Sequence, residues 1–197
     1  MKRLSLYLFL VLFTLQTPSQ ADDIRDFQIE GMSIGDSLLD YSTKAQIKIG
    51  KGNASFMKDK DEVNKYIIIF LNSLAKEEYD EIQVTYKIND KKYVIKSIDG
   101  VIKFDDNFKG CKKKKNIVVK QLKESFKNAK IKSVEKKHKA DKTGKSTHAS
   151  TYFNLDSGGQ AHVWCTNWSD EMQWTNSLLV TLRSEEYKYF LSHGGHY

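Results

Sequence analysis

The sequence predicts an α+β fold: a mainly antiparallel sheet with one long helix and short helices packed on one face. Two observations support this class. Segments with strand patterns outnumber those with helical spacing, and short turns join most successive strands, which favours antiparallel pairing. The chain of 197 residues carries one proline, Pro18, and has no stretch with the composition of a linker. We therefore expect residues 22–197 to form a single domain.

The first part of that domain has mixed patterns. Residues 27–41 predict a short strand, a glycine turn and a short helix with Asp36 or Ser37 as its N-cap. The polar stretch 44–62 is expected to be loop with one strand at most. The run 66–71 is β-branched and aromatic throughout, which predicts a central strand buried on both faces.

Two alternating segments, 82–88 and 93–104, flank the turn-forming residues 89–92 and predict an antiparallel pair. Gly100 lies inside the second segment, where a glycine indicates a bulge or a bend.

The longest predicted helix is capped by Asp105, Asp106 or Asn107 and runs to about Ala129. Its apolar residues recur at helical spacing and define one buried face. These residues are Cys111, Val118, Leu122, Phe126 and Ala129.

The remaining segments are mostly strands. A strand near 131–134 precedes a lysine-rich loop, and 149–155 and 160–167 alternate around a glycine turn and predict a hairpin. Another strand covers 175–182. A closing helix follows, with Ser184 as its N-cap and its end near Leu191.

The first 21 residues have the three parts of a cleavable export signal: the basic Lys2 and Arg3, an apolar run over 4–15, and small residues at Ser19 and Ala21. A retained signal anchor is the alternative. The run of about 12 residues is shorter than the roughly 20 needed to cross a bilayer, so we expect a chain that does not span a membrane. Export through the Sec pathway predicts a periplasmic location.

The formal net charge is +7, and removing the signal peptide leaves +5. The excess comes from lysine, a bias that an AT-rich genome alone would produce. If folding gathers the lysines, they form a basic patch that binds polyanions. Arginine is nearly absent, which argues against sequence-specific nucleic-acid binding. The candidate basic patch comprises Lys112, Lys113, Lys114, Lys115, Lys136, Lys137 and Lys139.

The two cysteines, Cys111 and Cys165, both lie on predicted inward faces. In an oxidising compartment we expect them to form a disulfide that ties the long helix to the sheet. A nucleophilic Cys165 with His162 as its base is the alternative. Residues three apart in a strand lie on opposite faces, which argues against that pair.

Strand alternation places four side chains on the face opposite Cys165: His162, Trp164, Thr166 and Trp168. Aromatic side chains on an open sheet face bind sugars or partners, although packing under a helix is the more usual arrangement. We take these four residues as the candidate binding face.

Three other motifs are better explained by local structure than by a catalytic or metal-binding role. Residues 143–146 resemble the end of a P-loop, but Lys139 stands where that motif needs glycine, so a tight turn is expected. His193 and His196 flank glycines at the chain end and are expected to lie in a mobile tail. Asp170 and Glu171 are interpreted as solvated. The sequence therefore predicts no catalytic residue, metal site or cofactor.

Several stretches resemble a family of small exported proteins from AT-rich marine alphaproteobacteria of the SAR11 (Pelagibacter) type. The resemblance rests on 29–41, 97–102, Cys111, 144–146 and 165–169, and 44–57 departs from it. It brings no established activity.

We therefore expect a non-enzymatic periplasmic protein that binds another protein or an envelope component. Two alternatives stay open: a hydrolase whose site assembles only in the fold, and lysine-mediated binding of polyanions.

Overall fold

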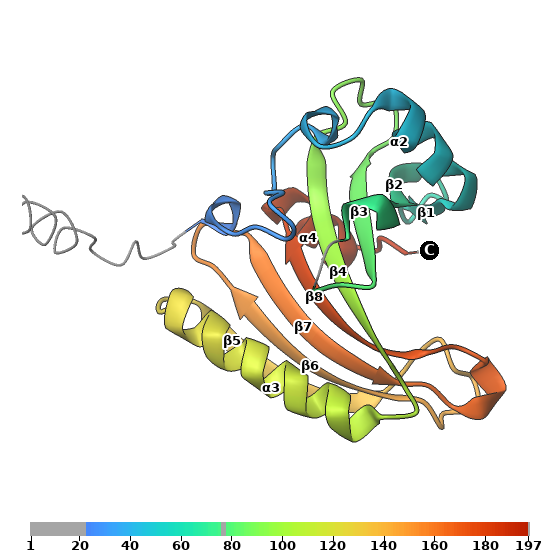
Figure 1. The fold of residues 1–197 in the computed structure, drawn as a ribbon, viewed down its shortest axis with the longest axis vertical. Coiled ribbons are helices and arrows are strands. Elements are labelled where there is room, and N and C mark those ends of the chain that lie inside the picture. Colours follow the sequence, from blue (N-terminus) through green and yellow to red (C-terminus); the bar gives the residue numbers. More distant parts are fainter. Residues whose placement is uncertain (1–22, 76–77, 197) are drawn as a thin grey trace, which may run out of the picture.

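The computed structural model describes residues 23–75 and 78–196, so the expected signal peptide lies outside the described residues. Eight strands form one antiparallel sheet in the order β1-β2-β3-β4-β8-β7-β6-β5 (Figure 1). This confirms a mixed α+β fold built mainly on an antiparallel sheet. The strands are β1 Ser55–Lys58, β2 Asn64–Phe70, β3 Glu81–Lys87, β4 Ile95–Asp105, β5 Lys130–Lys137, β6 Thr147–Asn154, β7 Gln160–Asn167 and β8 Asn176–Arg183.

Three α-helices and five short 3-10 helices complete the described part of the chain. None of these helices is long and apolar enough to cross a membrane. The α-helices are α2 Lys44–Gly50, α3 Phe108–Ser125 and α4 Glu185–Ser192. The 3-10 helices are η1 Ile24–Asp26, η2 Leu38–Asp40, η3 Lys51–Asn53, η4 Asn72–Leu74 and η5 Asp170–Met172.

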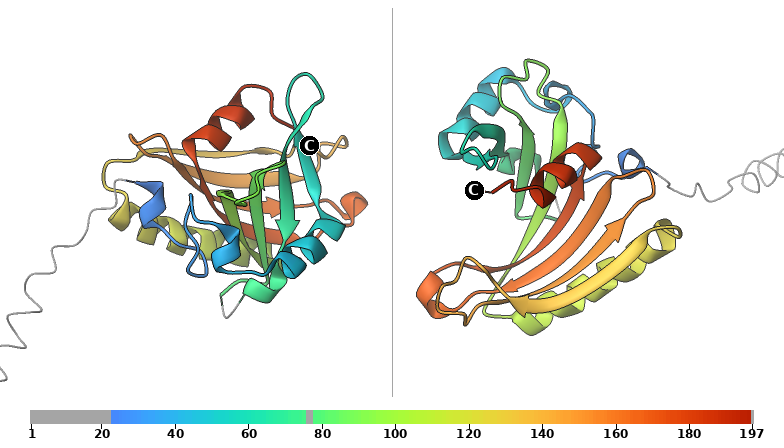
Figure 2. Two further views of the ribbon diagram at one scale, coloured as in Figure 1. Left: turned by 90° about the horizontal axis from the view of Figure 1, so that it is seen from above. Right: turned by 180° about the vertical axis from the view of Figure 1, so that it is seen from behind.

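The helices lie on both faces of the sheet, whereas the sequence predicted one face. Figure 2 shows α2 and α3 on one side of the strands and α4 on the other. In β2, Ile67 and Ile69 join the main core with α2. The alternate residues Tyr66 and Ile68 pack with Tyr187 of α4 in a smaller cluster. We call these the α3 face and the α4 face.

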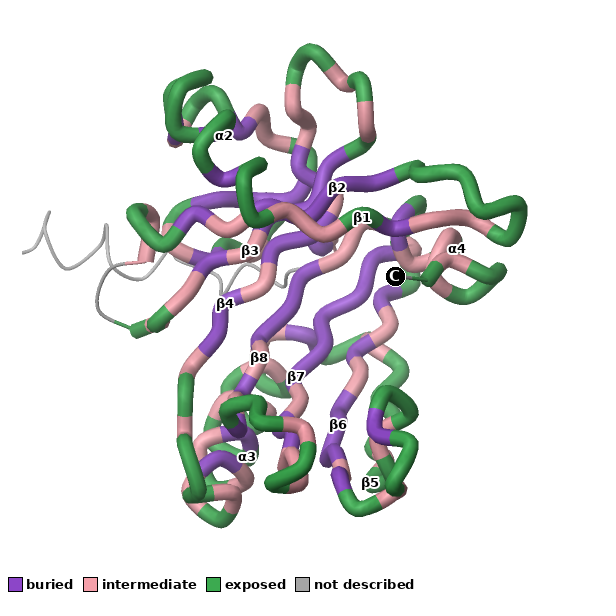
Figure 3. Tube along the Cα trace, turned by 90° about the vertical axis from the view of Figure 1, so that its right-hand side faces the viewer, coloured by how far each residue is buried: buried purple, intermediate pink, exposed green. Residues whose placement is uncertain are grey.

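The main core lies between α2, α3 and the centre of the sheet. Strand pairing aligns Ile98, Leu182 and Ala161 across β4, β8 and β7, and all three are buried. Figure 3 shows buried stretches along the strands of the sheet, with exposed residues at the loops. The predicted central strand is part of this core, because residues 66–69 of β2 are buried on both faces.

Both predicted hairpins form. β3 pairs with β4 and β6 pairs with β7, each antiparallel. Gly100 makes no bulge, because it pairs regularly with Ile82 and Val180. A Cβ atom at position 100 would lie 2.4 Å from the Tyr79 ring. The glycine therefore allows that ring to approach the strand.

Residues 44–62 differ most from expectation. They hold α2, η3 and β1 instead of a loop with one strand. Thr43 caps α2: its hydroxyl accepts from the Gln46 N–H at 3.2 Å, and the Gln46 side chain accepts from the Thr43 N–H at 2.8 Å. This capping box is a recognised start of a helix, and it was the sequence feature that could have predicted α2.

Two further segments also differ from the prediction. In 27–41 the strand reduces to an isolated bridge between Ile29 and Met32, and the helix is the 3-10 helix η2, capped by Ser37. Asn107 caps α3, which ends at Ser125 rather than near Ala129.

Residues 193–196 do not form a free tail. The backbone of His196 exchanges two hydrogen bonds with Lys58 of β1, at 2.8 and 3.0 Å. Its Nε2 lies 3.0 Å from the Glu62 carboxylate. Long-range pairing with a strand some 140 residues earlier is not visible in local sequence.

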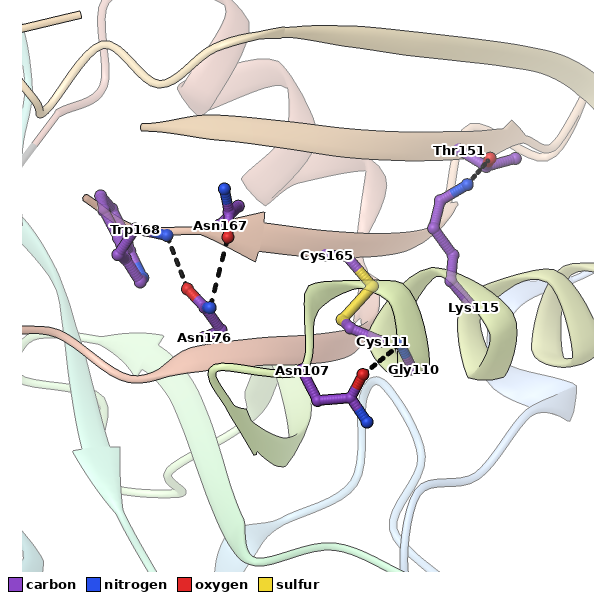
Figure 4. Close-up of a disulfide and its surroundings, with 9 residues drawn as sticks. All are labelled: Asn107, Gly110, Cys111, Lys115, Thr151, Cys165, Asn167, Trp168 and Asn176. Carbon is purple, nitrogen blue, oxygen red and sulfur yellow. Dashed lines mark hydrogen bonds between the residues drawn. A yellow bond between two sulfur atoms is a disulfide. The ribbon is translucent and has the colours of Figure 1, made fainter. Parts of the chain in front are cut away.

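The predicted disulfide is present. Cys111 of α3 bonds Cys165 of β7, with Cα atoms 5.9 Å apart (Figure 4). The bond joins α3 to the centre of the sheet, and both cysteines are fully buried.

Candidate functional site

A row of rings follows β6 and β7 on the α4 face and continues into the loops beyond these strands. Neighbouring ring centroids lie between 4.0 and 6.0 Å apart. Strand alternation places four of the rings, and the loops supply the other three. In spatial order the aromatic row is Tyr152, His162, Trp164, His148, His138, Trp168 and Trp174.

The structure keeps His162, Trp164 and Thr166 together on the face opposite Cys165, because they alternate along β7. Two of these side chains are too buried to contact a partner. His162 is 2% exposed and Thr166 is 3% exposed, so neither offers surface to a partner. Trp164 is half-buried, and Trp168 lies just beyond β7.

The surroundings of the three imidazoles in the row disfavour their charged form. Burial lowers the pKa of His138 and His148, and it lowers the pKa of His162 to well below the ordinary value. Among the described residues, neither ring nitrogen of His148 or His162 has a hydrogen-bond partner, and the Trp164 indole N–H also lacks one. The aromatic row is therefore an uncharged, packed strip. It supports Trp168 and Trp174 at its exposed end.

That end is a cleft of about 330 Å³ at the far end of β4, where three chain segments meet. Trp168 and Trp174 form an edge-to-face pair in it, with centroids 4.5 Å apart. Trp174 is 55% exposed. We call this site the tryptophan cleft; it is lined by Asp105, Asp106, Trp168, Ser169, Asp170, Gln173, Trp174, Thr175 and Asn176.

Hydrogen bonds fix the position of Trp168. Its backbone N–H donates to the Asn176 side-chain oxygen at 2.6 Å, and the Asn176 amide donates to Asn167 at 3.3 Å (Figure 4). This links the ends of β7 and β8. The cleft is therefore held by the sheet rather than by a free loop.

The tryptophan cleft is acidic, although the whole chain is basic. Asp105, Asp106 and Asp170 line it, and within the described residues none of the three forms a salt bridge. Two of its residues, Asp105 and Gln173, have positive φ, at 42° and 53°. Such backbone conformations are uncommon outside glycine and concentrate at binding sites.

Asp141 anchors the loop that carries His138. Its carboxylate accepts from the Ser146 N–H at 2.8 Å, from the Ser146 hydroxyl at 2.7 Å and from the Ser169 hydroxyl at 2.9 Å. The Thr143 hydroxyl donates to it as well. These bonds hold the pKa of Asp141 far below its usual range. The P-loop-like residues 143–146 are thus a turn fixed by Asp141, as the tight-turn interpretation predicted.

The hydrolase alternative gains a row of titratable groups inside the sheet. Asp99, Thr181 and His162 lie side by side across β4, β8 and β7. The Thr181 hydroxyl donates to Asp99, and burial raises the pKa of that carboxyl. The clefts of about 330, 460 and 610 Å³ that described residues line include neither Asp99 nor His162.

The predicted basic patch is divided. Lys115 is buried on α3, donates to the Thr151 hydroxyl at 2.9 Å (Figure 4) and has its pKa lowered by burial. Lys112 lies 3.5 Å from Glu135, and Lys114 lies 2.9 Å from Glu78. The exposed remainder comprises Lys113, Lys136, Lys137 and Lys139.

Metal ligands do not gather in the described part of the chain, where no group of three or more His, Cys, Asp or Glu residues could hold an ion.

The adjacent carboxylates Asp170 and Glu171 do not act together. Glu171 forms a salt bridge with Lys145, while Asp170 lines the tryptophan cleft. The two carboxylates therefore have different surroundings.

Comparison with protein-family models, with curated proteins and with solved structures returns no match to this chain.

Sequence reasoning found the aromatic strip of β7 but not the cleft. Trp174, Asp105 and Asp106 come from segments far apart in the chain, and only the end of the sheet brings them together. The tryptophan cluster and the aspartates ahead of α3 were visible in sequence, but nothing indicated that they meet.

Proposed function

We propose that this chain is an exported, non-enzymatic protein that binds another protein or an envelope component in the tryptophan cleft. One observation carries the proposal. An exposed tryptophan packs edge-to-face on a second one in a cleft whose aspartates have no salt-bridge partner among the described residues.

Tryptophan is the side chain most enriched among the few residues that dominate binding energy at interfaces. Trp174 has only two rotatable side-chain bonds and packs on Trp168, so little conformational entropy is lost when a partner covers it. The support beneath it is firm, because Trp168 is fixed through Asn176 to β8.

The chemistry of the cleft favours a partner that presents amino or guanidinium groups. Indole faces attract cations, and the carboxylates of Asp105, Asp106 and Asp170 add charge attraction. These carboxylates give the cleft a local negative charge although the whole chain is basic. We propose lysine or arginine side chains of a protein, or an amine of an envelope component.

The proposed location is the periplasm, reached through the Sec pathway. The Cys111–Cys165 disulfide supports it, because such bonds persist in oxidising compartments. The export signal proposed at residues 1–21 supplies the route.

Binding of oligolysine and oligoglutamate, followed by tryptophan fluorescence, tests the proposal. We expect saturable binding of oligolysine alone. Trp174→Ala should weaken it at least about tenfold, or 1.4 kcal/mol. Tyr189→Ala is the matched control, because Tyr189 is 62% exposed on α4 and lies outside the cleft.

Two results would overturn the proposal. One is oligolysine binding that is absent or is unchanged in Trp174→Ala. The other is turnover by the purified protein on panels of ester, phosphoester, glycoside or peptide substrates.

A further inference from the structure

A second cleft lies at the opposite end of β4 from the tryptophan cleft and on the α3 face. Its volume is about 460 Å³, within the range of small-molecule sites. It is formed by η3, the edge of the sheet and the β3–β4 turn. We call it the tyrosine cleft; it is lined by Lys51, Phe56, Ile67, Tyr86, Ile88, Asn89, Asp90, Lys91 and Tyr93.

The lining of this cleft is mainly apolar. Ile67 and Tyr86 are buried, and the Tyr86 ring meets the Tyr93 ring edge-to-face at 5.3 Å. Phe56 of β1 is 46% exposed at the rim. An apolar body that enters the cleft would remove this surface from water, which favours binding.

The charge at the mouth is positive. The Lys51 ammonium lies 5.4 Å from the Tyr93 ring centroid and 5.8 Å from that of Tyr86, and Lys91 also lines the cleft. Within residues 23–75 and 78–196, neither lysine forms a salt bridge. A ligand with an anionic group would therefore meet two available cations.

Asp90 is the one carboxylate among the described residues that line this cleft, and its oxygens already accept hydrogen bonds. Its two oxygens accept from the backbone N–H groups of Lys92 and Val94, each at 2.9 Å. Its carboxylate therefore stabilises the turn. The two lysines in the lining leave the cleft with a net positive charge.

Tyr86, which lines this cleft, also carries a buried polar atom. Its hydroxyl is buried and has no hydrogen-bond partner among the described residues. Burial raises the pKa of Tyr86 to about 12, so the hydroxyl keeps its proton at neutral pH. A buried donor without a partner costs free energy, so this hydroxyl is a local weak point in the packing behind the cleft.

The walls are held in place before any ligand arrives. Asn89 and Tyr93 have positive φ, at 67° and 51°, and the second value is unusual for a bulky residue. The Tyr93 carbonyl accepts from the Leu38 N–H at 3.0 Å, and the Ser37 hydroxyl donates to the Lys92 carbonyl at 2.8 Å. The turn is therefore fixed to η2.

We propose that the tyrosine cleft binds a free single-chain amphiphile with an anionic head group, of the fatty-acid type. The chain lies on Phe56, Ile67 and the tyrosine rings, and the head group meets Lys51 and Lys91. This site does not depend on the proposed function, because it lies on the other face and at the other end of β4.

Isothermal titration of the purified protein with dodecanoate, below its micelle concentration, tests this proposal. We expect saturable one-to-one binding and at least tenfold weaker binding to Lys51→Glu and to Phe56→Ala. Lys48→Glu is the matched control, because it makes the same charge change on exposed α2 surface outside the cleft. Dodecyltrimethylammonium should bind at least tenfold more weakly than dodecanoate. Circular dichroism melting confirms that each variant is folded.

Several outcomes would overturn the proposal. They are the absence of saturable dodecanoate binding, equal binding by Lys51→Glu and Lys48→Glu, and equal binding of the cationic amphiphile. Binding only to anionic vesicles would assign the cleft to a membrane surface. A dimer in sedimentation that Phe56→Ala dissociates would assign it to a second copy of the chain.

Discussion

Cys111 lies in the first turns of α3 and Cys165 lies near the end of β7. The disulfide between them closes a loop, with a sequence separation of 54 between the two cysteines. The helix and the strand both pack into the main core, so the bond joins two elements that already contact each other.

Removing this bond should cost about 4 kcal/mol in the free energy of unfolding, because the unfolded chain gains the freedom of a long open loop. Urea unfolding of wild type with and without reductant measures the loss. The Cys111→Ala, Cys165→Ala double variant should unfold at the same urea midpoint as the reduced wild type. Reductant should not change that midpoint further. An unchanged urea midpoint after verified reduction would contradict the expectation.

Asp141 should make stability depend on acidic pH. Its hydrogen bonds depress its pKa in the folded protein, so its contribution is complete above the ordinary value of 3.8 and is lost as the pH falls below it. Asp141→Asn should therefore have a lower urea midpoint than wild type at pH 6, and the gap should narrow toward pH 2. Asp61→Asn, at an exposed position, is the control. A gap that is constant with pH would refute the assignment.

Gly100→Ala should destabilise the fold by about 1–3 kcal/mol, because the new Cβ would lie 2.4 Å from the Tyr79 ring. Gly52→Ala is the control, since a Cβ there would meet nothing within 4 Å. Thermal melting compares the two. Adding Tyr79→Ala to Gly100→Ala should cost less than the single changes together, and strict additivity would argue against this contact.

Lys115→Met should raise the urea midpoint at pH 7. Burial lowers the pKa of Lys115, so keeping it charged in the folded state carries a penalty below that pKa, which disappears as the pH rises past 10.5. Thr151 keeps Ser133 as a partner at 3.0 Å. The exposed Lys113→Met provides the comparison. A midpoint below that of wild type would show that the Lys115–Thr151 bond outweighs the burial penalty.

Local sequence was enough for much of this fold. The hairpin of β6 and β7 alternates clearly around a glycine turn, and the cap at Ser184 starts α4 as predicted. Inward spacing and the expected compartment together predicted the disulfide. The hairpin and the cap depend on residues close together in sequence, and the disulfide depends on one pair of cysteines.

The rest depends on long-range geometry. α4 lies on the face opposite α3 because Tyr187 packs on Tyr66, which no local pattern indicates. His162 was predicted on the binding face yet is buried. The tryptophan cleft needs the ends of β4, β7 and β8 to meet, and only the whole sheet produces that arrangement.

The indole N–H resonances of the three tryptophans provide the most direct test of the proposed binding site. In a titration with oligolysine, followed by two-dimensional NMR, the signals of Trp168 and Trp174 should shift saturably. That of Trp164, whose indole nitrogen is buried, should move least. Oligoglutamate should leave all three unchanged. Equal shifts at all three indoles, or shifts with oligoglutamate but not oligolysine, would contradict binding in the tryptophan cleft.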